Sequence, residues 1–94
     1  MSFEKATKAR SQVTITTTPT LIAAANSRRS VIMFSVKSGQ TIYVGEDNTV
    51  AVDGAAGGFP MPVGASIEDR ETIDAWWART ESGTADVRVI EASL

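Results

Sequence analysis

The sequence predicts an all-β protein, a small antiparallel β-sandwich or jelly-roll-like barrel of about seven or eight short strands. Short runs in which apolar and polar residues alternate occur along the whole chain, as expected for half-buried strands. Glycine, proline and asparagine separate these runs, at the spacing typical of sandwiches and barrels. No segment has the periodicity of an amphipathic helix.

The chain divides into a basic N-terminal arm, residues 1–10, and a single β-sandwich domain, residues 11–94. The arm has no two-residue alternation and few large apolar side chains. It carries Lys5, Lys8 and Arg10 against Glu4, a net charge of +2, which leaves −4 for the rest because the total is −2. A frayed terminus and a segment that docks on a neighbouring subunit are the alternatives for the arm.

Five strands are expected in the first half of the domain. Residues 12–17 alternate apolar with hydroxylated side chains and end before Pro19, whose nitrogen cannot donate a ladder hydrogen bond. Residues 30–36 are apolar on both faces, which is typical of a central strand covered from two sides. The turn at 37–40 predicts a hairpin between this strand and the next. Strands are also expected at 41–45 and 49–52, and a short one at 20–25, where the alanines would tolerate a helix as well.

The second half begins with a loop. Three glycines within residues 53–58 supply conformational freedom that a regular element would not need. Pro60 and Pro62 then hold residues 59–63 extended. The remaining strands are expected at 65–69, 71–78 and 84–90.

Trp76 and Trp77 are adjacent within one of these strands. Because neighbouring side chains on a strand point to opposite faces, one ring is expected to anchor the core. The other is expected to lie where a second protein covers it, since aromatic side chains are enriched at interfaces. Shelter under residues 57–62 of the same chain is the alternative for this outer ring.

Arg28 and Arg29 lie together at a predicted turn. Their forked guanidinium groups are suited to bind carboxylates on a partner, and the acidic body of a second copy would supply them. A solvated turn is the alternative.

The chain has no histidine and no cysteine. Ordinary Ser-His-Asp and Cys-His relays and the common zinc ligand sets are therefore excluded, and we expect no enzyme activity, no cofactor and no metal site. Carboxylate pairs at 46–47 and 68–71 are the enzymatic alternative. An ion held by Asp47, Asn48 and Asp53 is the alternative for the acidic loop 46–53.

The sequence also indicates where the chain is made and what it does not bind. No apolar run is long enough for a signal peptide or a membrane span. The net charge of −2 argues against a nucleic-acid partner, because phosphate binding needs a positive field. Synthesis in the cytoplasm with neither a membrane nor a nucleic-acid partner is therefore expected.

Several phrases of the sequence resemble small structural proteins of tailed bacteriophages, which decorate or cement capsids or form modules of tails and fibres. These phrases are TLIAAANSRRSVI at 20–32, TIYVG at 41–45, GFPMPVGAS at 58–66 and SGTADVRVIE at 82–91. The resemblance spans about residues 11–92 and leaves the basic arm outside. It implies a β-sandwich that binds other virion proteins, often as a trimer, and it brings no active-site residues.

The function expected from this resemblance is that of a capsid decoration, or cement, protein on the virion surface, synthesised in the host cytoplasm. Its partner would be the major capsid protein, and its assembly a homotrimer. The residues expected to contact partners are Phe3, Lys5, Lys8, Arg10, Arg28, Arg29, Trp76 and Trp77. A tail, neck or fibre module is one alternative. A carbohydrate-binding module that uses Trp76 or Trp77 with Tyr43 is another.

Overall fold

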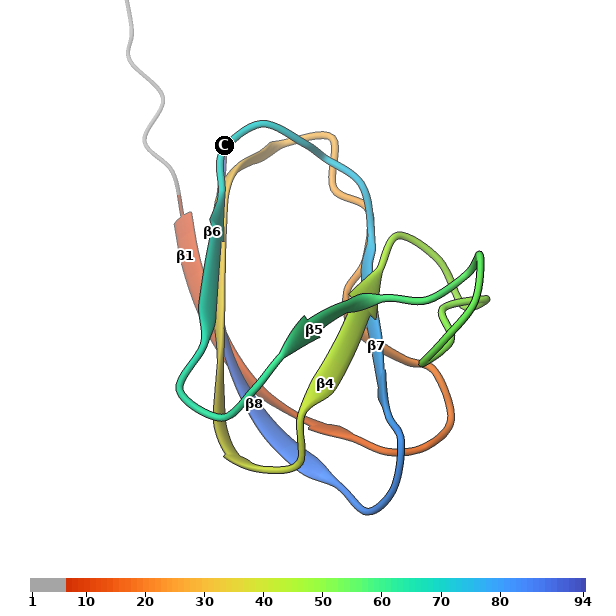
Figure 1. Cartoon of the computed structure of the whole chain (residues 1–94). Helices are drawn as coiled ribbons and strands as arrows, with labels where there is room; N and C mark the ends of the chain where they lie inside the picture. Colours follow the sequence, from red (N-terminus) through yellow and green to blue (C-terminus); the bar gives the residue numbers. More distant parts are fainter. Residues whose placement is uncertain (1–6) are drawn as a thin grey trace, which may run out of the picture.

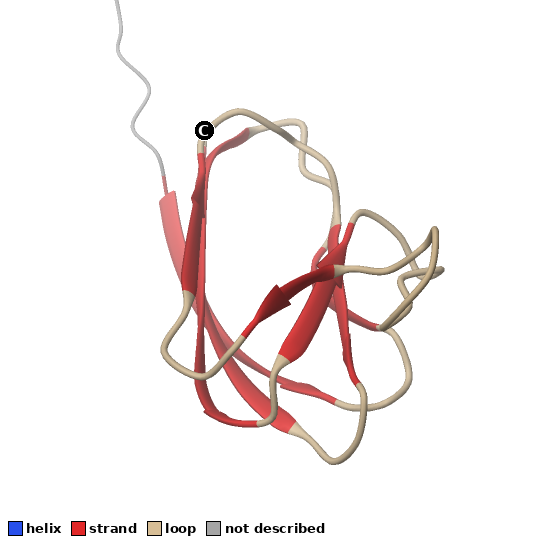
Figure 2. Ribbon diagram, in the orientation of Figure 1, coloured by secondary structure: helices blue, strands red, loops and turns tan. Residues whose placement is uncertain are grey.

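The alternating segments form eight β-strands. The computed structural model describes residues 7–94, and within them every regular element is a strand (Figures 1 and 2). The strands are β1 (Thr7–Ile15), β2 (Thr20–Ala23), β3 (Arg29–Gly39), β4 (Ile42–Gly45), β5 (Phe59–Met61), β6 (Ser66–Asp69), β7 (Trp76–Thr80) and β8 (Ala85–Ser93). The predicted all-β class is confirmed.

The strands form two antiparallel sheets of four. Sheet A has the order β1-β8-β3-β6 and sheet B the order β2-β7-β4-β5, and Figure 1 shows them as two facing layers. The first strand pairs with the last, the second with the seventh, the third with the sixth and the fourth with the fifth. The chain is therefore one long hairpin whose paired arms roll up, which is a jelly-roll arrangement.

The core lies between the sheets, where their apolar inner faces meet. Each strand directs every second side chain inward, and burial of one large aliphatic or aromatic side chain is worth roughly 1.5–3 kcal/mol. Sheet A contributes Ile15, Ile32, Phe34, Val36, Val87 and Val89, and sheet B contributes Ile22, Ile42, Val44, Met61 and Ala78. In residues 7–94 every buried polar side-chain atom has a hydrogen-bond partner.

The hairpin predicted between residues 30–36 and 41–45 is wrong. β3 pairs with β6 and β8, whereas β4 pairs with β5 and β7. The turn after β3 carries the chain from sheet A to sheet B, because both strands have inner faces that bury against the opposite sheet. β3 is central in its sheet but is covered on its inner face alone, since Met33 on the outer face is 44% exposed.

The extents of several strands also differ from the prediction, and three of the differences change the arrangement. β1 begins at Thr7, so residues 7–10 of the predicted arm pair with β8. Residues 49–52 form only an isolated bridge between Ala51 and Gly57. β7 begins at Trp76 instead of residue 71 because the Asp69 carboxylate accepts hydrogen bonds from the backbone N–H groups of Glu71 and Thr72, which turns the chain there.

Candidate docking cleft

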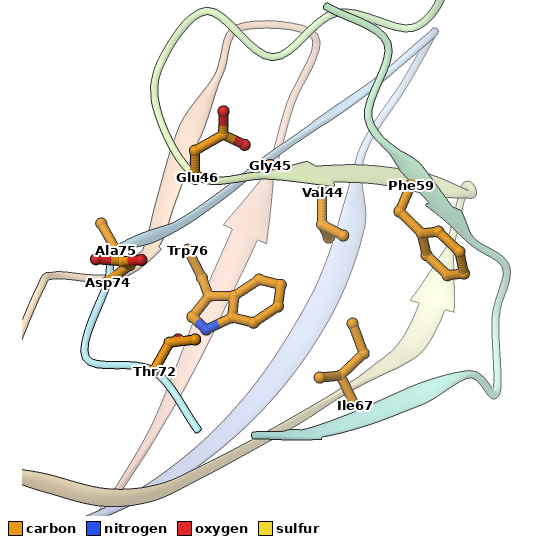
Figure 3. A pocket seen from close by; sticks show the side chains of 9 residues that line it. All are labelled: Val44, Gly45, Glu46, Phe59, Ile67, Thr72, Asp74, Ala75 and Trp76. Atoms are coloured by element: carbon orange, nitrogen blue, oxygen red, sulfur yellow. The ribbon is translucent and has the colours of Figure 1, made fainter. Parts of the chain in front are cut away.

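An apolar cleft lies on the open side of the sandwich, between β5 at the edge of sheet B and β6 at the edge of sheet A. Its volume is about 540 Å³. Its apolar lining comes from Val44, Phe59, Ile67 and Trp76. Figure 3 shows the side chains of Val44, Ile67 and Trp76 directed towards a common space. Such a lining fits an apolar segment of another molecule better than a polar ligand.

The cleft exists because the two edge strands are too short to close the sandwich. β5 has three residues and β6 has four. Met61 of β5 is buried in the core at 1% exposure, whereas Phe59, two residues earlier and on the same face, is 68% exposed. A large aromatic side chain therefore lies at the mouth of the cleft with little of its surface covered.

Trp76 forms the floor of the cleft and also contacts the core. Its ring meets Phe34 edge to face, with 5.2 Å between centroids and 65° between planes. Its indole Nε1–H donates to Oδ2 of Asp69 at 3.2 Å. Trp76 is therefore the ring that anchors the core, although one side of it is left facing the cleft.

Asp69 organises the wall beside Trp76. Its carboxylate accepts from the Thr72 hydroxyl at 2.6 Å, from the Glu71 backbone N–H at 2.8 Å and from the Thr72 backbone N–H at 3.1 Å. The Thr72 hydroxyl is the main reason that the pKa of Asp69 lies below its ordinary value, with the backbone and Trp76 donors adding to it against the opposing effect of burial. The carboxylate is thus held ionised as a brace for the 70–75 turn.

The acidic residues considered for catalysis or ion binding are occupied locally or dispersed. The carboxylate of Asp47 accepts from the backbone N–H of Thr49 at 2.9 Å and from the Thr49 hydroxyl at 2.5 Å, and the hydroxyl is the main reason that the pKa of Asp47 is lowered. Glu46 lies at the cleft, but its carboxylate points away from the cavity (Figure 3). Within residues 7–94 no three acidic side chains come together as a metal site would require.

Trp77 lies on the outer face of sheet B. Ala78 and Thr80 are buried, so Trp77 and Arg79 point away from the core. Trp77 is half-buried and stands opposite Leu21 on β2 and Gly45 on β4. The two tryptophans therefore face opposite sides of the sheet, as their adjacency predicts.

Arg29 is committed inside the protein, so its expected role in binding a partner needs correction. Its side chain is 1% exposed and pairs with Glu91 at 2.6 Å. Its two terminal nitrogens donate to the carbonyls of Asp74 at 2.7 Å and Ala24 at 2.8 Å. The guanidinium therefore ties three segments together. Arg28 is exposed, and its Nε–H donates to the carbonyl of Leu94.

The four predicted contact residues of the arm fall in two groups. Phe3 and Lys5 lie outside the described residues. Lys8 and Arg10 are exposed in β1, opposite Ala92 and Ile90 of β8. These two basic side chains share the outer face of sheet A.

The cleft itself was not predicted from the sequence. Phe59 and Ile67 belong to predicted extended segments, but nothing local indicates that these segments become opposite edges of a gap. The Asp69-x-x-Thr72 spacing is a usable signal for the turn, since short polar side chains often cap such turns. Its link to Trp76 depends on the fold.

Comparison with known proteins assigns no family. No protein-family model and no curated protein matches the chain. Among solved structures, a chain of the Bacillus endospore appendages, described as a novel family of disulfide-linked pili, is 14% identical with a TM-score of 0.47. The alignment covers 100% of this chain and 95% of that one. This likeness is too distant to carry an argument about function.

Residues 7–94 contain no helix that could cross a membrane.

Proposed function

We propose that this protein is a structural component of a tailed-bacteriophage particle, a head decoration or cement protein that binds the major capsid protein and stabilises its shell. The observation that carries the proposal is the apolar cleft beside the exposed ring of Phe59, a surface that another protein would cover. The phage-like phrases of the sequence support the same conclusion.

A second apolar surface is suited to face the shell. Met33 and Ile90 are cross-strand neighbours on the outer face of sheet A, 44% and 39% exposed. Arg10 and Arg88 line a shallow hollow beside them, with Arg88 paired to Asp86 of its own strand at 3.0 Å, and Glu68 stands opposite Met33 on the same face. An apolar centre with charges of both signs around it is suited to an apolar patch with complementary charges at its rim. Burial of about 800 Å² per partner suffices for a stable contact, and many symmetric copies add avidity.

Electron microscopy of particles purified from cells that produce the chain tests the location. We expect density on the head surface at a regular position of the shell lattice. We also expect shells that lack the protein to break at a lower temperature than decorated shells. Particles in which the heads carry no such density would overturn the proposal.

A matched pair of variants tests the outer face. Met33→Glu places a charge at the centre of the apolar patch and is expected to abolish binding to undecorated shells. Val63→Glu changes another exposed apolar residue, 50% exposed in the turn between β5 and β6, and is expected to bind normally. Both variants should stay folded, which circular dichroism checks.

A tail, neck or fibre module is the alternative within the same particle. The same images separate it from the head assignment, because the density would then lie on the tail. The apolar cleft serves both assignments equally well, so the location decides between them.

A carbohydrate-binding module is the alternative from another class, and one observation favours it. Trp77 and Tyr43 are diagonal neighbours on the outer face of sheet B, since Trp77 stands opposite Gly45 and Arg79 opposite Tyr43. Glycan-array binding that is lost with Trp77→Ala and kept with Leu21→Ala would support this reading. An array without binding would exclude it.

A further inference from the structure

Within residues 7–94, no further strand covers either edge of sheet A. β1 pairs along one side with β8, and β6 pairs along one side with β3, so each has an unpaired side within residues 7–94. β1 is nine residues long, and all of Thr7–Gln12 is exposed. A long exposed edge strand is a ready template for a further strand.

The direction of the strands permits a second copy to continue the sheet. Each neighbouring pair in the order β1-β8-β3-β6 is antiparallel. β1 and β6 therefore run in opposite directions. A second copy in the same orientation, placed beside the first, brings its β1 antiparallel to β6, and the alternation continues across the contact.

The charges of the two edges are opposite. β1 carries Lys8 and Arg10, which form no ion pair within the described residues. β6 carries Glu68, and Glu71 follows it in the turn. Glu68 meets Arg70 of its own chain at 3.2 Å, but both side chains are about half exposed, so that pair is weak and exchangeable. Pairing β1 with β1, or β6 with β6, would bring like charges together.

We propose that copies of this protein assemble head to tail, with β1 of one copy added to β6 of the next and Lys8 opposite Glu68. This gives a mechanism for the homo-oligomer that the sequence resemblance implies, and it does not depend on the virion assignment. Arg10 then lies diagonal to Glu68, and all three side chains lie on the outer face. A contact of this kind closes into a ring, such as a trimer, or continues as a filament.

The same register brings the neighbour's β1 to the cleft. Ala9 of the added strand stands opposite Ile67, on the inner face. The inward-facing residues Ala9 and Ser11 are exposed in the monomer because sheet B does not extend over them. Because Ala9 and Ser11 are small, the added strand can approach the mouth of the cleft and cover Ile67 and Phe59. β6 has only four residues, so the ladder with the added strand is short, and this apolar burial strengthens the contact.

Cross-linking of two single-cysteine variants tests the register, and the cysteine-free chain makes the result unambiguous. Lys8→Cys and Glu68→Cys chains are mixed and oxidised. We expect a mixed disulfide dimer, because directly opposite residues lie within bridging distance. Neither variant alone is expected to dimerise. The pair Thr14→Cys and Glu68→Cys is the control, since six residues of strand add about 20 Å. Absence of the mixed dimer, or equal dimers from one variant alone, would overturn the proposal.

Charge reversal tests the complementarity in buffer without any capsid. Lys8→Glu with Arg10→Glu, and separately Glu68→Lys with Glu71→Lys, are each expected to weaken assembly at least about tenfold by light scattering. The chain carrying all four changes should assemble again. All four residues are exposed, so denaturation should show folded protein throughout. Folded half-reversed chains that assemble normally, or a fourfold variant that stays monomeric, would contradict head-to-tail pairing. Either result leaves the head location to the virion images.

Discussion

Adjacent residues of this chain have very different roles, and the two arginines before β3 are a clear case. Arg29 is buried and donates hydrogen bonds to the carboxylate of Glu91 and to the carbonyls of Asp74 and Ala24. Arg28 is exposed. Both were predicted to bind a partner because their surroundings in the chain are nearly identical. Their environments diverge only when β8 and the 70–75 turn fold against Arg29.

Arg29→Ala is expected to lower the free energy of unfolding by roughly 3 kcal/mol, because it leaves Glu91 without its partner and two carbonyls without their donor. Arg28→Ala is the matched control, with an expected change within about 0.5 kcal/mol. Urea denaturation measures both. Equal stability of the two variants would mean that the Arg29 contacts contribute little.

Asp69 connects the turn, the core and the cleft through Trp76. Asp69→Asn replaces one acceptor oxygen by an amide that cannot accept from Thr72 or Trp76, and a loss of about 1–3 kcal/mol is expected at neutral pH. Glu68→Gln, on the exposed face of the same strand, should change the stability by less than about 0.5 kcal/mol.

The pH dependence of this difference provides a second measurement. The pKa of Asp69 is lowered in the folded protein, mainly by the Thr72 hydroxyl. Its contribution to stability is therefore complete above the unfolded pKa and is lost as the pH falls through the folded pKa. The advantage of the native chain over Asp69→Asn should shrink on acidification from neutral pH to about pH 2. A difference that stays constant over this range would show that ionisation of Asp69 is not the source.

At the scale of the elements, local patterns located strands better than they paired them. The strands predicted at 12–17, 20–25 and 84–90 overlap β1, β2 and β8. The turn after β3 has ordinary hairpin residues, yet it connects two sheets. β3 forms its ladders with β6 and β8, which are far along the chain, so a local signal could not reveal its partners.

Gly39 lies at the turn that carries the chain from sheet A to sheet B, and substituting it tests why the turn needs a glycine. Its φ is +96°, and an added Cβ would lie 2.3 Å from the backbone oxygen of Thr84. Gly39→Ala should therefore cost about 3 kcal/mol or more through strain and overlap. Gly64→Ala is the control for φ alone, since Gly64 has φ +91° but nothing within 4 Å of the added Cβ. Its expected cost is about 1 kcal/mol. Thermal and urea denaturation of both variants should give this order, and similar costs would rule out the overlap with Thr84.

At the scale of the whole molecule, the jelly roll follows from a simple pairing of strands counted inward from the two ends of the chain, first with last and second with seventh. The sequence predicts the class and approximate number of strands, and it predicts that the two tryptophans face opposite ways. It does not reveal which strands form edges, since this depends on all eight pairings together. The cleft lies between two such edges, and for that reason Trp76 was singled out from the sequence whereas Val44, Phe59 and Ile67 were not.

Phe59 is expected to contribute to self-association and not to the stability of the monomer. Phe59→Ser should leave the stability of the monomer within about 0.5 kcal/mol, because this ring is 68% exposed. It should also weaken self-association, because the cleft loses its largest uncovered side chain. Val63→Ser removes an apolar side chain that is not part of the cleft lining and should preserve self-association. Light scattering measures the assembly, and unchanged assembly of Phe59→Ser would mean that the cleft mouth takes no part in it.

The pairing of β1 with β8 also determines at what point of synthesis the β1 edge can form. β8 lies between β1 and β3 and leaves the ribosome after all of the other strands, so β1 has no ladder partner until then. While β8 is still inside the ribosome, β1 of the nascent chain is therefore unpaired and sheet A is incomplete. Because domains fold as units, only a chain that has been translated through β8 presents a formed β1 edge. Shortened products of stalled translation would thus lack the basic edge and would not be built into an assembly.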